Sequence, residues 1–315
     1  MITTVTLNPA LDRIYWVERL DRETGILTRA EKSLAEAGGK GINVSLFLAR
    51  LGVETVAMGF IAGLTGRLIE SDLREEGVTT NFVWTDGETR TNIAILERGR
   101  EAKPIEVNES GPRIDATRID QFLRKYRRIL KRTDFVVLSG SLPPGVPSGF
   151  YRELVELARD EHVPAIINTG EGPIKEAVTA SPYLIKPDIR ERQEVEYRSC
   201  ESRAEALEVA HELIGDYAGI SLISHETMGD ILITPDKVWD LESRRDQVQV
   251  VNIIGAGDAI IGGIIYKLLK GDSIEEAARF GMAAAIASAE SPEKVVGDLN
   301  IIETEMAKVE IRELL

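Results

Sequence analysis

Four consecutive residues carry the clearest chemical signal in this chain: Gly255, Ala256, Gly257 and Asp258. They stand directly before an apolar, helix-compatible run over 259–269. Glycine allows a backbone to approach a ligand closely, and the first N–H groups of a helix attract an anion such as phosphate. A carboxylate beside a phosphate costs energy unless it has chemical work. We therefore expect Asp258 to accept a proton from a hydroxyl group that attacks the phosphate.

The motif at residues 255–258 is a weak signal by itself, and a second glycine-rich segment strengthens it. Taken alone, residues 255–258 are more typical of an ordinary helix start with Asp258 as its N-cap. Residues 37–44 form another glycine-rich turn that runs into a helix, and they contain Gly39, Lys40 and Asn43. The spacing is not that of a Walker A motif, but backbone N–H groups and one ammonium are suited to holding an anion.

Two further candidates follow predicted strands. Asp12 comes after the strand 2–7 and the Asn-Pro that ends it, and Ser139 opens a turn after the strand 135–138. Carboxyl ends of strands face the ligand crevice of open α/β sheets, which makes Asp12 a candidate substrate contact. An aspartate that stabilises a turn after proline is an equally good interpretation of Asp12.

Composition limits the class of protein. The chain has 315 residues, of which 43% are hydrophobic, and a formal net charge of −14, which argues against nucleic acid or an anionic membrane as partner. The single cysteine, Cys200, cannot form an intrachain disulfide, which fits a reducing compartment. The N-terminus does not resemble a signal peptide, no run is long enough to span a bilayer, and the histidines lack ligand spacing. We expect a cytoplasmic protein without a structural metal site.

Strands and helices alternate along most of the chain, which predicts right-handed crossovers and a mostly parallel sheet. We expect strands at 2–7, 53–59, 135–138, 165–168, 183–185 and 220–224, a hairpin over 231–241, and helices at 45–51, 66–76, 115–131, 259–269, 274–289 and 301–310. Two β excursions interrupt this pattern, with strands predicted at 13–17, 26–34, 80–85, 91–97 and 105–108. No linker divides the chain, so we expect one domain, 1–315, whose excursions (about 12–36 and about 80–108) pair as a small lid.

Several ordered motifs resemble the PfkB (ribokinase-like) carbohydrate kinases, in particular the branch of 1-phosphofructokinase and tagatose-6-phosphate kinase. The resemblance covers nearly the whole chain and rests on residues 6–12, 38–44, 87–92, 108–112, 139–145, 186–187 and 255–258. It implies a three-layer α/β/α fold with a mostly parallel central sheet and a small β-sheet lid, with the sugar held between them. It also implies ATP as phosphoryl donor, Mg²⁺, and a homodimer formed through the lid.

The resemblance assigns expected roles to individual residues. Asp258 matches the catalytic base, and Gly255, Ala256 and Gly257 match the anion hole. The sugar-site positions are Asp12, Gly39, Lys40, Asn43 and, in the same crevice, Ser139. The cations expected to hold a phosphate already on the sugar are Lys40, Arg90 and Arg29. The nucleotide side comprises Lys186, Asp188, Ser224, Gly229, Gly257 and Ala284, and the expected metal contacts, through water, are Asp188 and Glu191.

The chain departs from the family pattern at three places. Asp188 stands where the family has asparagine, so dependence on a metal ion is expected to be sharper. Only Ser224 and Gly229 keep the pattern of the nucleotide loop, which leaves the nucleoside triphosphate open. Asn168 begins a segment, 168–170, that usually starts with aspartate. Ala284 lies in an alanine-rich helix, where a helix–helix contact is the more common reason for small residues.

Lys40 and Arg90 favour a substrate that is already phosphorylated, since a kinase for neutral sugars needs no such pair. The expected reaction converts fructose 1-phosphate to fructose 1,6-bisphosphate, with tagatose 6-phosphate and fructose 6-phosphate as rival substrates. A catalytically idle sugar or nucleotide sensor on the same fold is the alternative of a different class. A Rossmann dehydrogenase does not fit, because no Gly-x-Gly-x-x-Gly follows the first strand.

Overall fold

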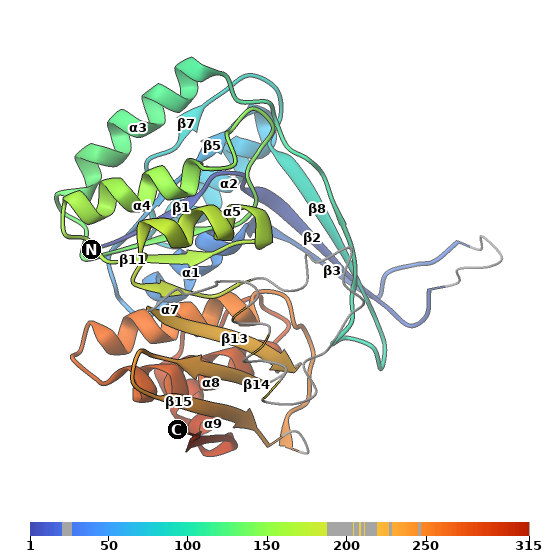
Figure 1. The fold of residues 1–315 in the computed structure, drawn as a ribbon. Helices are drawn as coiled ribbons and strands as arrows, with labels where there is room; N and C mark the ends of the chain where they lie inside the picture. Colours follow the sequence, from blue (N-terminus) through green and yellow to red (C-terminus); the bar gives the residue numbers. More distant parts are fainter. Residues whose placement is uncertain are drawn as a thin grey trace.

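The computed structural model describes residues 1–20, 27–187, 204, 208, 211, 219–226, 229–244 and 247–314. These residues form a large sheet covered by helices and a smaller sheet that projects from the main body (Figure 1). The predicted fold class, α/β with a mostly parallel central sheet and a small second sheet, is confirmed.

The main sheet is a 10-stranded sheet. In spatial order its strands are β16 (Val309–Glu313), β15 (Val238–Ser243), β14 (Gly229–Ile233), β13 (Ile220–Glu226), β12 (Leu184–Ile185), β11 (Ala165–Asn168), β10 (Phe135–Ser139), β1 (Ile2–Thr6), β4 (Thr55–Met58) and β6 (Thr79–Thr80). Every neighbouring pair from β6 to β13 is parallel, and every pair from β13 to β16 is antiparallel. Parallel strands place their carboxyl ends at one edge of the sheet, and that edge carries the candidate site.

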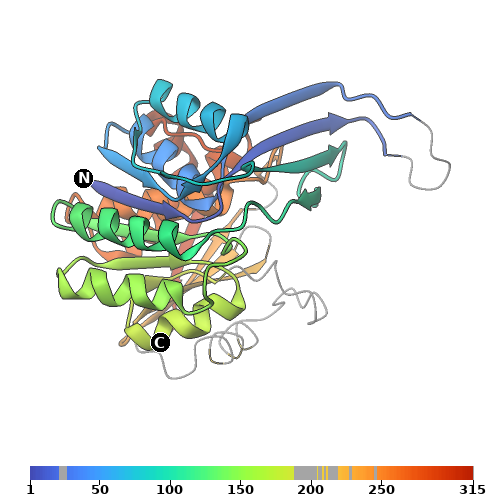
Figure 2. The same cartoon turned by 90° about the horizontal axis from the view of Figure 1, so that it is seen from above.

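Alternating strand residues face two separate apolar cores, because successive side chains of a strand point to opposite faces. In β10, Val136 and Leu138 belong to one core and Val137 to the other. The helices of the first core are α3 (Ala116–Leu130), α4 (Phe150–Asp160) and α5 (Glu171–Ala177), followed by a 3₁₀ turn at Val178–Ala180. Those of the second are α1 (Lys40–Arg50), α2 (Gly63–Glu75), α7 (Ala256–Leu268), α8 (Ile274–Ala289) and α9 (Leu299–Glu305). The view from above shows the two layers on opposite sides of the sheet (Figure 2).

Helix α3 shows how the sequence produces one of these layers. Phe122, Tyr126 and Leu130 follow at four-residue spacing and form its buried stripe. The side chain of Asp115 caps its start by accepting from the N–H of Arg118. Among the described residues, no helix is long and apolar enough to cross a membrane.

The helices that begin at the glycine-rich turns start earlier than predicted. Helix α1 begins at Lys40 rather than at 45, and α7 begins at Ala256 rather than at 259. The prediction treated every glycine as part of a turn. Only the residues before the helices, Gly39 and Gly255, have positive φ angles, of 112° and 86°, so Gly41 and Gly257 are free to join the first turns.

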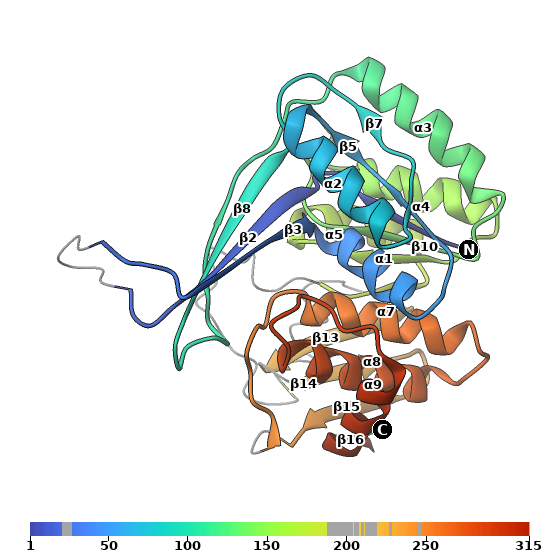
Figure 3. The same cartoon turned by 180° about the vertical axis from the view of Figure 1, so that it is seen from behind.

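The second sheet has the strand order β3 (Lys32–Gly38), β2 (Ala10–Val17), β8 (Arg90–Glu97) and β9 (Ile105–Asn108). Strands of both excursions therefore lie in this sheet, which extends away from the main body (Figure 3). The strand expected at 26–34 was misplaced, since β3 begins only at Lys32. Its register is set by pairing with β2, where Asp12 lies opposite Glu36, and local alternation alone does not show this.

Two other predictions needed correction. The expected strand 80–85 is divided between β6 in the main sheet and β7 (Val83–Trp84), which pairs with β5 (Phe60–Ile61). The expected helix 301–310 ends at Glu305 and continues as a 3₁₀ turn, Met306–Lys308, and then as β16. Strand β16 forms because it pairs with the exposed edge of β15, which outweighs the local helix preference of a glutamate-rich segment.

Candidate active site

The candidate site lies where three parallel strands of the main sheet end. Asn8 follows β1, Ser139 is the last residue of β10, and Asn168 is the last residue of β11. Thr6 pairs with Ser139 and Ser139 with Asn168, so the three ends lie side by side. This is the ligand-binding edge of an open α/β sheet.

The carboxylate of Asp258 is held between two amide groups at this edge. Its Oδ2 accepts a hydrogen bond from Asn43 Nδ2 (2.8 Å), and its Oδ1 accepts one from Asn168 Nδ2 (3.1 Å). Asp258 is 7% exposed and lies in the first turn of α7, where the helix dipole favours a negative charge. The two amide donors therefore fix the direction of this carboxylate at the start of α7.

The turn before Asp258 requires glycine at one position and leaves space at another. A Cβ added to Gly255 would lie 2.4 Å from the carbonyl oxygen of Lys294, and the φ angle of Gly255 is 86°. A Cβ added to Gly257 would meet no atom within 4 Å. The helix start thus faces open space beside the Asp258 carboxylate, as an anion-binding turn requires.

The first glycine-rich turn meets the second at this place. Gly39 has a φ angle of 112°, and a Cβ there would lie 2.6 Å from Cγ2 of Thr6. Lys40 is the first residue of α1 and is half-buried. Asn43, which donates to Asp258, stands three residues later and so lies on the same face of the helix as Lys40. The first turn of α1, which begins with Lys40, thus lies against Asp258.

Ser139 supports the start of α1 rather than lining an open crevice. Its side chain is fully buried, and its hydroxyl lies next to Gly41, where a Cβ would come within 2.9 Å of Ser139 Oγ. The hydroxyl of Tyr151 donates to the carbonyl oxygen of Ser139 (2.8 Å) and fixes the turn that follows β10.

Asp12 reaches the site from the second sheet. Its Oδ1 accepts from Asn92 Nδ2 (3.0 Å) and its Oδ2 accepts from Lys294 Nζ (3.0 Å). A Cβ on Gly38 would lie 2.0 Å from Asp12 Oδ2, so glycine there makes room for the carboxylate. Sequence reasoning missed Lys294, which follows a helix in a polar segment and is 282 residues from its partner.

The segment 87–92 holds the second sheet against the main body. Glu88 accepts from the N–H groups of Thr65 (2.6 Å) and Leu64 (3.2 Å) at the start of α2. Thr89 Oγ1 accepts from the N–H of Ala62 (2.7 Å). This anchoring fixes the start of β8, which carries Arg90 and Asn92.

Arg90 lies at the start of β8, close to the end of β1. Its Nε donates to the carbonyl oxygen of Asn8 (3.0 Å), and its Nη1 donates to that of Glu109 (3.1 Å). In the sheet, Arg90 pairs with Ala10, which in turn pairs with Gly38. Arg90 and Gly38 of the first glycine-rich turn therefore lie on either side of Ala10.

A separate polar cluster lies at the ends of β12, β13 and β14. Lys186 Nζ contacts Ser224 Oγ (2.6 Å) and Asp230 Oδ1 (3.4 Å), and Ser224 Oγ donates to Asp230 Oδ1 (2.7 Å). Lys186 and Asp230 are both buried, and Gly229 is the first residue of β14. The predicted nucleotide-side residues Lys186, Ser224 and Gly229 are thus neighbours. Asp230 was missed, because nothing in a short apolar strand marks its one buried carboxylate.

Two predicted residues, Arg29 and Ala284, do not join these clusters, and two others lie outside the described residues. Arg29 is exposed and precedes β3 near the end of the second sheet that lies away from Asp12. Ala284 is fully buried in the core between helices, which matches the helix-packing interpretation and not a nucleotide contact. Asp188 and Glu191 lie outside the described residues.

The described residues do not provide a metal site. No group of three or more histidine, cysteine, aspartate or glutamate side chains in this part of the chain is placed to hold an ion. Mg²⁺ needs few protein ligands when it binds with nucleotide phosphates, but the candidates, Asp188 and Glu191, are not among the described residues. We therefore assign no step to a metal ion.

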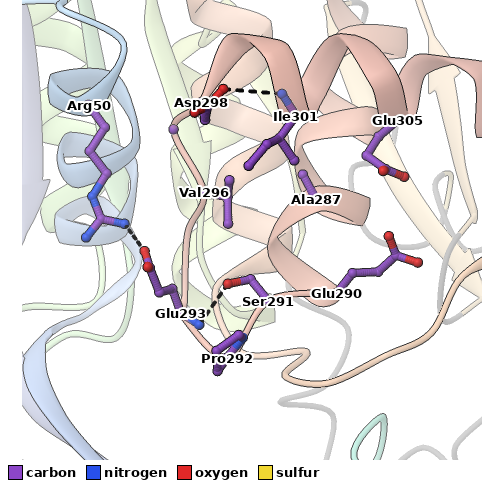
Figure 4. Close-up of a pocket in the computed structure, with 11 residues that line it drawn as sticks. Arg50, Ala287, Glu290, Ser291, Pro292, Glu293, Val296, Asp298, Ile301 and Glu305 are labelled. Carbon is purple, nitrogen blue, oxygen red and sulfur yellow. Dashed lines mark hydrogen bonds and ion pairs between the residues drawn. The ribbon is translucent and has the colours of Figure 1, made fainter.

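A pocket of about 510 Å³ lies apart from these residues, beside the segment that joins α8 to α9 (Figure 4). Arg50, Glu290, Glu293 and Glu305 contribute charged groups to its wall. Neither Asp12 nor Asp258 lines it. The pocket is therefore not the place where the candidate chemistry occurs.

Comparison with known proteins identifies the family of this chain. The family model described as "pfkB family carbohydrate kinase" matches residues 6–296. The chain belongs to this family. It is therefore a carbohydrate kinase, a phosphotransferase, and the family implies a nucleotide as phosphoryl donor.

Individual relatives agree over nearly the full length. The chain is 34% identical over 293 residues to 1-phosphofructokinase of Bacillus subtilis, covering 93% of this chain and 94% of that protein. It is 30% identical over 294 residues to tagatose-6-phosphate kinase of Staphylococcus epidermidis, covering 91% and 92%. A crystal structure from Thermotoga maritima, described as "Possible 1-phosphofructokinase", matches with a TM-score of 0.89 and 34% identity over 100% of this chain and 99% of that one.

The anchoring by Glu88 predicts a pH-dependent stability. Hydrogen bonds from the N–H groups of Thr65 and Leu64 lower the pKa of Glu88 below its ordinary value of 4.5. The ionised carboxylate thus stabilises the fold above that value, and the contribution is lost as the pH falls through the lowered pKa. Glu88→Gln should lower the Tm at pH 7, and the difference from the unmodified protein should shrink towards pH 3.

Thermal unfolding followed by circular dichroism at several pH values measures this difference. Glu54→Gln, at an exposed carboxylate of the main body, is the control and should leave the Tm unchanged throughout. A deficit of Glu88→Gln that stays constant from pH 7 to pH 3 would show that Glu88 acts by packing and not by its charge.

Proposed function

We propose that this kinase transfers the γ-phosphoryl group of ATP to a hydroxyl of a phosphorylated ketohexose, with fructose 1-phosphate as the substrate and fructose 1,6-bisphosphate as the product. The observation that carries the proposal is the pair of amides that hold Asp258 at the start of α7, next to the start of α1. One glycine-rich turn would receive the phosphoryl group, and the other would hold the anion already on the sugar.

Asp258 is the proposed general base. The attacking hydroxyl lies between its carboxylate and the γ-phosphorus, and Asp258 takes the proton as the new P–O bond forms. The N–H groups of Gly255, Ala256 and Gly257 stabilise the charge on the phosphoryl oxygens. Because Asn43 and Asn168 already hold the carboxylate in one direction, little reorganisation is needed when the hydroxyl arrives.

Lys40 and Arg90 are proposed to bind the phosphate already on the sugar. They stand at neighbouring positions around the first glycine-rich turn, Lys40 at the start of α1 and Arg90 beside Asn8. Asp12, held by Asn92, is placed to accept hydrogen bonds from sugar hydroxyls. Two cations at one end of the sugar would set the distance at which the far hydroxyl meets Asp258.

The nucleotide would lie towards Lys186, Ser224 and Gly229, which are brought together at the next strand ends. Tagatose 6-phosphate and fructose 6-phosphate remain rival substrates, because the phosphate can be held with either end of the sugar towards the clamp. Membership of the carbohydrate kinase family argues against the idle sensor that the sequence had left open. The intact Asp258 and its two amide partners favour an enzyme.

One prediction concerns the proposed catalytic base. General-base catalysis contributes about 10²–10⁴-fold, so Asp258→Asn should lose about that much of kcat with saturating substrates. The fold should be preserved, because Asn43 Oδ1 has no partner among the described residues and its amide group can turn to accept from the new side chain. Steady-state ADP release, with the Tm as a check of folding, measures both. Near-normal turnover of this variant would remove Asp258 from the mechanism.

Another prediction concerns the sugar substrate. A coupled assay should show the highest kcat/KM on fructose 1-phosphate among fructose 1-phosphate, tagatose 6-phosphate, fructose 6-phosphate and unphosphorylated fructose. Arg90→Ala should raise KM for the phosphorylated substrate by roughly 10- to 100-fold, the cost of one hydrogen bond to a charged group. Equal activity on unphosphorylated fructose would contradict the clamp, and absence of ADP release with every sugar would favour the sensor.

Arg98→Ala is the matched control for Arg90→Ala. Arg98 follows the far end of β8 and forms surface ion pairs with Glu18 and Glu31. Its loss should leave KM unchanged. A similar rise of KM in both variants would mean that general loss of positive charge, and not the position of Arg90, weakens binding.

We also propose a homodimer formed through the outer face of the second sheet. Tyr15, Ile93, Ile95, Ile105 and Val107 share this face, since Ile93 pairs with Val107 and Ile95 with both Tyr15 and Ile105. Ile93 is 36% exposed and Val107 is 57% exposed. Contiguous apolar side chains on a sheet face favour coverage by another protein surface.

Ile93→Glu together with Val107→Glu should convert a dimer into a monomer, because two charges would be buried in each half of the contact. Size-exclusion chromatography with light scattering measures the mass. Leu64→Glu, on the exposed side of α2, is the control and should leave the mass unchanged. An unmodified protein that is already a monomer at micromolar concentration would contradict the proposal.

A further inference from the structure

Lys294 has an unusual position for a lysine. Its side chain is 1% exposed, although it carries a charge and belongs to the segment between α8 and α9. Its ammonium donates to Asp12 Oδ2 (3.0 Å) and to the carbonyl oxygen of Ala37, and it lies 3.7 Å from Glu36 Oε1. The two acceptors and Glu36 all belong to β2 and β3 of the second sheet. Lys294 thus connects the main body to the strand that carries the candidate sugar contact.

The segment that carries Lys294 is also held from its other side. Arg50, at the end of α1, donates to Glu293 Oε2 (2.9 Å) and to the carbonyl oxygen of Val295. Figure 4 shows the side chain of Arg50 pointing from α1 towards Glu293 on this segment. The N–H of Val296 donates to Ser288 Oγ (3.0 Å) in α8. Because its neighbours are fixed in this way, Lys294 presents its ammonium from a defined position.

The backbone of Lys294 touches the other half of the site. A Cβ added to Gly255 would lie 2.4 Å from the carbonyl oxygen of Lys294. Gly255 begins the turn that leads to Asp258. A single residue therefore contacts the sugar-side carboxylate with its side chain and the phosphoryl-transfer turn with its main chain.

Stability alone does not account for this ammonium. A buried ion pair costs desolvation energy that its attraction roughly offsets, and a well-packed apolar substitute is often as stable or more so. Burial raises the pKa of Glu36, and the charge of Lys294 lowers it again without cancelling the effect of burial. The arrangement thus holds two carboxyl groups and one ammonium in a buried place, where ion pairs in general add little net stability.

We propose that Lys294 is a positioning residue: it fixes the direction of the Asp12 carboxylate and sets the second sheet against the Gly255 turn, so that sugar binding and phosphoryl transfer share one geometry. The proposal rests on the proposed function, because Asp12 is taken to contact the sugar. Lys294 itself does not touch the substrate, since its ammonium is enclosed by Asp12, Glu36 and Ala37.

Lys294→Met tests the proposal in the full-length enzyme. We expect KM for fructose 1-phosphate to rise by roughly tenfold or more, the cost of one hydrogen bond to a charged group. The kcat should fall as well, and KM for ATP should remain unchanged. An unchanged KM for the sugar phosphate in a folded variant would overturn the proposal.

Lys308→Met is the matched control. Lys308 also places one ammonium between two carboxylates, Glu290 (2.8 Å) and Glu305 (2.7 Å), in the same region but away from Asp12. Its loss should lower the Tm and leave both KM values unchanged. If Lys308→Met and Lys294→Met changed KM equally, the effect would be one of general stability, and the positioning role would be wrong.

A double variant, Lys294→Met with Glu36→Gln, keeps the test valid if the single variant does not fold. Removing one carboxylate together with the ammonium leaves Asp12 as the one charge of the group and should recover the Tm. KM for the sugar phosphate should remain high, because Asp12 has still lost its donor. Recovery of KM together with the Tm would show that Lys294 is only structural.

A measurement without substrate separates this proposal from the proposed function. In a crystal structure of the double variant, the Asp12 carboxylate should leave the direction in which Oδ1 accepts from Asn92 and Oδ2 faces residue 294. An unchanged Asp12 would overturn the positioning role whichever sugar the enzyme uses. If the unmodified enzyme bound none of the sugar phosphates in calorimetry, the proposed function would fail, and this structure would still decide the role of Lys294.

Discussion

Two amide groups hold the Asp258 carboxylate, and this contact requires distant parts of the chain to meet. Asn43 comes from the first turn of α1, Asn168 from the end of β11, and Asp258 from the first turn of α7. The two helices can approach because a Cβ on Gly262 of α7 would lie 2.3 Å from the ring of Phe47 in α1. Close packing of α1 on α7 is thus the condition under which both glycine-rich turns face one space. A buried carboxylate without such donors would be costly.

The distribution of charge follows the same constraint. The chain carries a net charge of −14, so a site for anionic substrates must place its few cations deliberately. Two buried ammonium groups show this: Lys186 contacts Asp230, and Lys294 contacts Asp12. In each pair the two charged groups orient each other. Each pair also lies close to residues that are predicted to contact a ligand. Both buried ammonium groups therefore stand in local pairs with a carboxylate.

How far the sequence predicts this structure depends on the range of each interaction. The mostly parallel sheet, the small second sheet and the glycine-rich turns could be predicted, because the alternation of strands and helices and the glycine positions can be read from the sequence. The final strand β16 could not, because its partner β15 is more than sixty residues earlier in the chain. The same holds for Lys294 and Asp230, whose roles exist only through contacts with Asp12 and Lys186. Asn168 was noted for its departure from a family pattern, but its hydrogen bond to Asp258 became visible only in the fold.

Strand β2 of the second sheet contributes to the candidate site with one face and to the proposed dimer contact with the other. In β2, Asp12 and Ile14 face the main body, and Arg13 and Tyr15 face the other way, since strand residues alternate. Trp16 donates to the carbonyl oxygen of Val251, and Ile254 packs with the inner face of this sheet, so the sheet is also in contact with the segment before Gly255. A partner that covers the outer face would therefore stabilise the register that places Asp12 inside. In the proposed dimer, the contact between subunits and the site lie on opposite faces of the same strand, β2. A substitution on the outer face would therefore alter the position of the Asp12 carboxylate by shifting this strand.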